Sequence, residues 1–71
     1  MINSQKVNAR MKELDLTQTK VAAEMNIAQS TLNQKINNAR PMDLDEAELL
    51  QRILKIADSE FGSYFFYHGV A

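Results

Sequence analysis

The chain has 71 residues, no cysteine and a formal net charge of −1. A chain this short forms a single domain, residues 1–71, with a modest core. Without cysteine, and with His68 as its only histidine, it is neither a disulfide scaffold nor a zinc finger. Its polar N-terminus is not a secretory signal, and no apolar run approaches the roughly 20 residues that a membrane span needs.

Five helices are predicted, and the first begins near the N-terminus. Residues 4–14 carry apolar side chains at positions i, i+4 and i+7, which make one buried stripe, and Asn3 or Ser4 caps this helix. The second helix covers residues 18–25 and follows Thr17, which is its N-cap. Each of these helices is expected to bury one face.

The third helix, residues 29–37, follows a tight turn at Asn26, a residue type that tolerates the left-handed conformation. Leu32 and Ile36 are its only large apolar residues, and their spacing stacks them on one side. At about 100° per residue, the opposite side is polar. This polar strip has Ser30 and Gln34 at its centre, Gln29 at its leading edge, and Thr31, Asn33 and Asn37 beside them.

A proline ends this region, and two further helices are predicted after it. Asp43 and Glu46 have the spacing of a capping box at the start of the fourth helix, which is predicted to cover residues 44–57. The fifth covers residues 59–66 and is rich in aromatic side chains, and residues 67–71 are expected to fray. The predicted fold class is all-α, a compact five-helix domain with helices two and three as a helix-turn-helix.

The composition of the polar strip favours base reading by the third helix. Amides and hydroxyls both donate and accept hydrogen bonds, so they match the edges of DNA bases. A helix that needs only solubility is more often coated with Glu and Lys. The alternative is an ordinary solvated face, but the position of the strip directly after a tight turn favours DNA.

Charge is divided unevenly along the chain. Residues 1–40 carry six basic and three acidic side chains, whereas residues 41–71 carry two basic and six acidic ones. A basic half and an acidic half suggest one face turned to phosphate and one turned away. Because small helical proteins often have uneven charge by chance, this division supports a nucleic-acid partner only together with the polar strip.

Residues 16–32 contain a motif that is found in a known family. The residues that carry it are Leu16, Thr17, Gln18, Ala22, Ile27 and Leu32. The motif resembles the helix-turn-helix of phage repressors and Cro proteins, the lambda-repressor-like or XRE group, with Asn26 in place of the usual turn glycine and Ala28 in place of a Ser or Thr cap. The later helices are similar to those of short regulators of phages of Gram-positive bacteria.

The resemblance implies that the third helix enters the major groove while the second crosses the DNA backbone. The strip lacks Arg and Lys, so its contacts are expected to favour A·T base pairs. The predicted base contacts are Gln29, Ser30, Thr31, Asn33 and Gln34. The predicted DNA backbone contacts are Thr17, Gln18, Thr19, Lys20, Lys35, Asn37, Asn38 and Arg40.

These features predict a sequence-specific double-stranded DNA-binding transcriptional regulator of the repressor or Cro type, cytoplasmic and associated with the nucleoid of a bacterial or phage-infected cell. We expect a homodimer on a two-fold operator. The alternative is a protein-interaction module, such as an antirepressor, adaptor or antitoxin-like partner, that acts through the acidic, aromatic C-terminal half. No catalytic constellation is present, so no enzyme activity, cofactor, metal or small-molecule ligand is predicted. The candidate dimer interface consists of Phe61, Tyr64, Phe65, Phe66 and Tyr67.

Overall fold

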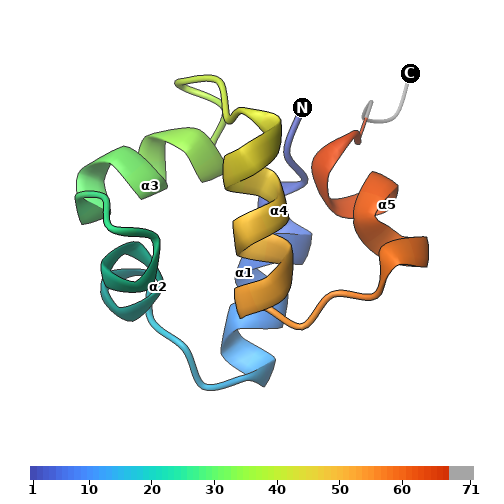
Figure 1. Ribbon diagram of the computed structural model, residues 1–71, viewed down its shortest axis with the longest axis horizontal. Coiled ribbons are helices and arrows are strands. Elements are labelled where there is room, and N and C mark those ends of the chain that lie inside the picture. The colour runs from blue at the N-terminus through green and yellow to red at the C-terminus, as the bar shows by residue number, and fades with distance from the viewer. Residues whose placement is uncertain (68–71) are drawn as a thin grey trace.

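Polar residues cap the first turns of the first, second and fourth helices expected from the sequence. Side-chain oxygens of Asn3 and Thr17 each accept the backbone N–H three residues later, at 3.2 and 3.1 Å. Asp43 and Glu46 form the expected capping box, each accepting the other's backbone N–H, at 2.8 and 3.0 Å. The computed structural model describes residues 1–67, and its elements are α1 (Ser4–Glu13), α2 (Gln18–Met25), α3 (Gln29–Ile36), α4 (Leu44–Ile53), a 3-10 turn (Asp58–Glu60) and α5 (Phe61–Phe65) (Figure 1).

The first four helices end at a non-glycine residue in the left-handed conformation. Values of φ between 54° and 64° occur at Asp15, Asn26, Asn38 and Lys55. In each case the next residue donates its N–H to the carbonyl five residues earlier, which is the Schellman pattern. The prediction that the fourth helix continues to residue 57 is wrong, because Lys55 turns the chain away after Ile53. A lysine carries none of the local signal by which glycine marks such an end.

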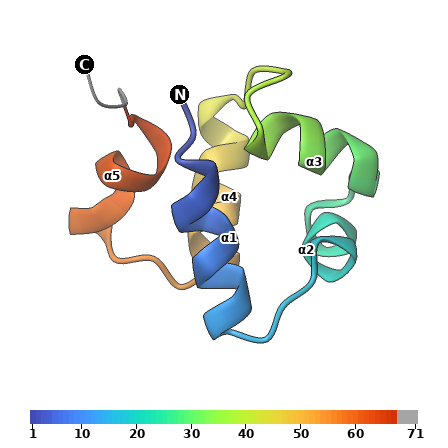
Figure 2. The ribbon, with the colours of Figure 1, turned by 180° about the vertical axis from the view of Figure 1, so that it is seen from behind.

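The apolar faces of the helices meet in one core. Helix α2 packs on α3 and α4, and α1 packs on α5. Figure 1 shows α4 in front of α1 at the centre, with α2 and α3 on one side and α5 on the other, and Figure 2 shows the same order from behind. The helix-turn-helix and α5 therefore lie on opposite sides of a central helix pair. The largest fully buried side chains are Leu32, Ile36, Leu50, Leu54, Val7 and Val21.

Two cations of the basic N-terminal half hold helices together. Arg10 donates from Nε to the Leu54 carbonyl at 2.9 Å and from Nη2 to the Lys55 carbonyl at 3.1 Å. These carbonyls end α4, where a cation is favourable. Lys6 Nζ lies 4.8 Å from the centre of the Tyr64 ring, which joins α1 to α5. Fewer cations are therefore left for a basic face than the charge count suggests.

Most aromatic side chains of α5 fill the core. Tyr64 and Phe65 are only 7% and 3% exposed, and the ring centres of Phe61 and Phe65 lie 4.8 Å apart. The expectation that all five C-terminal aromatic residues form a dimer interface is therefore wrong for Tyr64 and Phe65, because their rings are covered within one chain. Phe66 alone among the phenylalanines is widely exposed.

The two ends of the described chain are held side by side. Tyr67 donates its N–H to the Met1 carbonyl at 3.0 Å, and Asn3 donates its N–H to the Tyr64 carbonyl at 2.8 Å. Tyr67, the first residue of the segment expected to fray, is thus hydrogen-bonded to the N-terminal residue. The rest of that prediction concerns residues 68–71, which lie outside the described residues.

Candidate nucleic-acid interface

The outward face of α3 is the polar strip expected from the sequence. Leu32 and Ile36 are fully buried, and they orient the helix on the core. The opposite side chains are open to solvent, so helical periodicity correctly separated the buried from the outward residues. Thr31, at the edge of the strip, is partly covered. The exposed residues of the strip are Gln29, Ser30, Asn33, Gln34 and, just after the helix, Asn37.

Side chains at the start of α2 brace this strip. Asn33 donates from Nδ2 to Gln18 Oε1 at 3.2 Å, and Thr19 donates from Oγ1 to Gln29 Oε1 at 3.2 Å. Both bonds engage an amide oxygen, so the NH₂ groups of Gln18 and Gln29 remain available as donors. Because a side chain that is already held loses less entropy on binding, the bracing prepares the strip for a partner.

A tight turn sets α3 against α2. Asn26 adopts the left-handed conformation with φ 59° and ψ 41°, and Ile27 donates its N–H to the Ala22 carbonyl at 3.0 Å. Ala28 then precedes α3 in an extended conformation, and it has no side-chain oxygen that could cap the helix. The first amides of α3 therefore lack a side-chain acceptor, in a place where a helix favours an anion.

Supplying that missing cap should stabilise the protein. The backbone of Ala28, with φ −68° and ψ 147°, suits an N-cap residue. The hydroxyl in Ala28→Thr can accept the Thr31 N–H, and we expect a gain of about 0.5–1 kcal/mol in the free energy of unfolding. Urea titrations followed by circular dichroism measure it. Ala28→Val has the same shape without the hydroxyl, and an equal gain in this variant would exclude capping as the cause.

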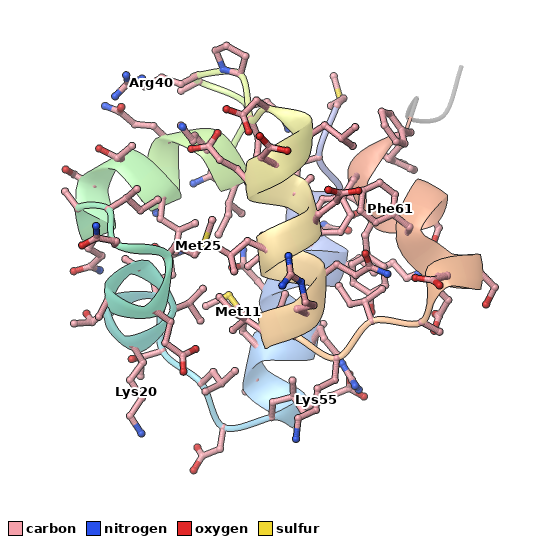
Figure 3. The ribbon with its side chains drawn as sticks, in the orientation of Figure 1. Met11, Lys20, Met25, Arg40, Lys55 and Phe61 are labelled. Atoms are coloured by element: carbon pink, nitrogen blue, oxygen red, sulfur yellow. The ribbon has the colours of Figure 1, made fainter. Side chains whose placement is uncertain are left out.

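Two exposed cations flank the helix-turn-helix. Lys20 and Arg40 are exposed, and within residues 1–67 neither has an acidic side chain in ion-pair distance. Figure 3 shows Lys20 beside α2 and Arg40 on the α3–α4 loop, at opposite ends of this side of the molecule. Positive charge at both ends and hydrogen-bonding groups between them match a duplex, in which phosphates border the base edges.

A helix-turn-helix family model of the XRE type matches residues 7–61. The chain belongs to this helix-turn-helix family. The family is one of DNA-binding regulatory proteins, and the matched range contains both helices of the braced unit. Comparison with curated proteins and with solved structures gave no match.

Within this helix-turn-helix chain, Asn38 is engaged by the protein itself. Its Oδ1 accepts the Ile2 N–H at 2.7 Å, and its Nδ2 donates to the Ile2 carbonyl at 2.9 Å. Its left-handed backbone also ends α3. Because both ends of the amide already hold the N-terminal segment, Asn38 has a structural role that competes with the predicted contact to the DNA backbone.

Lys35 is likewise engaged within the chain. Its Nζ pairs with Glu46 Oε2, and the two side chains are only 14% and 21% exposed. The other oxygen of Glu46 accepts the Asp43 N–H, so the pair links α3 to the capping box of α4. Sequence reasoning missed this link, although Lys35 stands about 60° from Leu32 around the helix, at the edge of its buried side.

Within residues 1–67, no group of three or more His, Cys, Asp or Glu side chains is placed to hold a metal ion. None of the helices formed by these residues is both long and apolar enough to traverse a bilayer.

Proposed function

We propose that this chain is a transcriptional regulator of the repressor or Cro type, which binds a specific double-stranded DNA site with α3 in the major groove. The observation that carries the proposal is the outward face of α3, where amides and hydroxyls are oriented by buried Leu32 and Ile36 and braced by α2. A helix fits the major groove, and these groups match the donors and acceptors of base edges there.

The proposed contacts divide into base and backbone contacts. Amide side chains pair bidentately with adenine, and the Thr31 methyl group suits thymine, so we propose a preference for A·T base pairs. The proposed base contacts are Gln29, Ser30, Thr31, Asn33 and Gln34. The proposed backbone contacts are Thr17, Gln18, Thr19, Lys20, Asn37 and Arg40, without Lys35 and Asn38, whose side chains are engaged within the protein.

The regulator is proposed to act as a homodimer on a two-fold operator. With Lys20 and Arg40 as its exposed cations near α2 and α3, one copy neutralises few phosphates and gains modest affinity. Two copies bound to one site together supply the additional affinity. Repression then follows when the bound dimer occludes promoter elements. A place on the nucleoid, in the cytoplasm of a bacterial or phage-infected cell, is a further part of this proposal.

The alternative, a protein-interaction module built on the aromatic C-terminal half, is not favoured. Its surface would consist of aromatic rings, but Tyr64 and Phe65 are buried and Phe61 packs on Phe65. An interaction module of that kind also leaves the braced polar strip of α3 without a role. The family to which the chain belongs is a DNA-binding one.

Selection of binding sites from random duplex DNA, followed by anisotropy titrations at several salt concentrations, tests the proposed function. We expect one A·T-rich sequence, repeated as a two-fold site, to bind far more tightly than random DNA. Equal affinity for selected and random duplexes at every salt concentration would contradict the proposal.

Gln34→Ala should relax the sequence preference. Gln34 is exposed at the centre of the strip, so its loss removes hydrogen bonds to a base edge without disturbing the core. We expect a cost of about 1–3 kcal/mol on the selected site and almost none on random DNA. Anisotropy titrations with both duplexes measure this difference.

Lys20→Ala is the matched control, because Lys20 is also exposed but is proposed to contact phosphate. It should weaken binding to both duplexes alike and reduce the salt slope by about 1. If Gln34→Ala behaves as Lys20→Ala does, then Gln34 does not read a base.

A further inference from the structure

The two hydrogen bonds that brace the polar strip of α3 use different halves of the amides in the strip. Asn33 contributes a donor, because its Nδ2 bonds to Gln18 Oε1 at 3.2 Å. Gln29 contributes its acceptor, because its Oε1 bonds to the Thr19 hydroxyl at 3.2 Å. An amide has two N–H donors and one acceptor oxygen. Asn33 therefore keeps both an acceptor and a donor for a partner, whereas the uncommitted groups of Gln29 are its two donors.

The position of Thr19 in α2 directs its hydroxyl proton to Gln29. A threonine in the middle of a helix can donate its hydroxyl to the carbonyl three or four residues earlier. Thr19 is the second residue of α2, so the residues at those distances precede the helix. Its hydroxyl donates instead across the helix-turn-helix, to the first residue of α3. Because a β-branched side chain has few rotamers, the hydroxyl is held in this direction.

The same bond decides how Thr19 meets the DNA backbone. Phosphate oxygens only accept hydrogen bonds, and the single proton of the Thr19 hydroxyl is already used. The proposed contact of Thr19 with phosphate therefore falls to its backbone N–H. This N–H lies in the first turn of α2, where N–H groups have no carbonyl partner within the helix. Removal of the hydroxyl leaves that contact in place.

Packing holds Thr19 and Gln29 in register. Helices α2 and α3 pack on each other, as both ribbon views show, and the left-handed turn at Asn26 joins them (Figures 1 and 2). Both side chains are exposed, so in water their hydrogen bond competes with solvent and contributes little to stability. When DNA covers them, water is excluded and the bond gains strength. The effect of the bond is therefore expected on DNA.

We propose that Thr19 determines which base Gln29 reads, by fixing Gln29 as a donor that contacts guanine rather than adenine. This assignment deepens the proposed function and rests on it, because it applies only with α3 in the major groove. Adenine presents the acceptor N7 beside the donor N6, so an amide needs both its oxygen and its nitrogen to pair with it. Guanine presents two acceptors, N7 and O6, which suit the two donors left on Gln29. The proposed A·T preference then has one exception, at the base pair under Gln29.

Anisotropy titrations with matched duplexes test the role of Thr19. Gln29→Ala first identifies the base pair, as the position of the selected site at which sequence preference disappears. With that pair changed in both half-sites, the wild type should bind G·C at least as tightly as A·T. Thr19→Val has the same shape without the hydroxyl, so it frees Oε1 and should bind A·T about fivefold or more tighter than G·C. Thr19→Ser retains a hydroxyl and should keep the wild-type order.

The base pair under Asn33 is the internal control. Asn33→Ala locates this pair in the same way, and the free acceptor and donor of Asn33 suit adenine there. The wild type and Thr19→Val should share one preference at this position, because Thr19 bonds to Gln29 and not to Asn33. A change in general affinity cancels, since each comparison is made between two duplexes with one protein. Circular dichroism confirms that each variant is folded.

The outcomes separate the role of Thr19 from the proposed function. Tighter binding of A·T than of G·C by the wild type at the Gln29 pair would overturn the role of Thr19, and so would an unchanged order in Thr19→Val. A Gln29→Ala variant that keeps every base preference would also overturn it, because Gln29 would then read no base. In these three cases the proposed function stands. Equal affinity of the wild type for selected and random duplexes would overturn the proposed function first.

Discussion

Leu32→Ala should unfold a large fraction of the protein and abolish DNA binding with it. Leu32 is fully buried, and it anchors α3 to the core from the centre of the helix-turn-helix. Removing a buried leucine side chain costs the lost transfer free energy and leaves a cavity, together about 3 kcal/mol. A 71-residue domain has only a few kcal/mol to lose, so its melting temperature should fall by more than about 10 °C. Differential scanning calorimetry measures this shift.

Leu44→Ala is the matched control, because it makes the same chemical change at an exposed position near the start of a helix. At concentrations where the chain is monomeric, its effect on the melting temperature should stay within about 4 °C. A small effect of Leu32→Ala would mean that α3 is not held by this anchor, and the orientation of the polar strip would then lose its physical basis.

Those parts of the fold that depend on periodicity and on capping chemistry could be predicted from the sequence. The spacing of Leu32 and Ile36 oriented α3 correctly, because two buried anchors four residues apart define one side of a helix. The Thr17 cap and the capping box of Asp43 and Glu46 are present, because each depends on residues only three positions apart. Interactions this local are visible in a single sequence.

The features that could not be predicted depend on contacts between segments that are distant in the sequence. The end of α4 at Ile53 is fixed by a left-handed Lys55 whose carbonyl accepts from Arg10, and nothing close to Lys55 in the sequence marks it. Asn38 pairs with Ile2, 36 positions away. In the candidate interface, the polar strip followed from periodicity. The cations that contact phosphate could not be assigned in this way, because the assignment requires knowing which charged side chains are already paired within the protein.

The role of Lys35 likewise depends on its partner in another helix. We expect the variant Lys35→Met to show that this residue positions α3. Its ion pair with Glu46 is largely covered, so the substitution leaves a carboxylate without its partner. We expect a loss of about 2 kcal/mol in the free energy of unfolding, between the values for exposed and for buried pairs. Adding Glu46→Gln, which keeps an acceptor for the Asp43 N–H, should recover part of the loss.

DNA binding by the folded Lys35→Met protein separates this role from a phosphate contact. If Lys35 acts through Glu46, the salt slope of binding stays at the wild-type value, whereas Lys20→Ala lowers it by about 1. Affinity for the selected site should fall more than affinity for random DNA, because a displaced α3 misaligns its hydrogen bonds with the base edges. A salt slope lowered to the same extent as in Lys20→Ala, without loss of stability, would instead make Lys35 a phosphate ligand. In that event Glu46 would compete with DNA for Lys35, and Glu46→Gln alone should strengthen binding to every duplex.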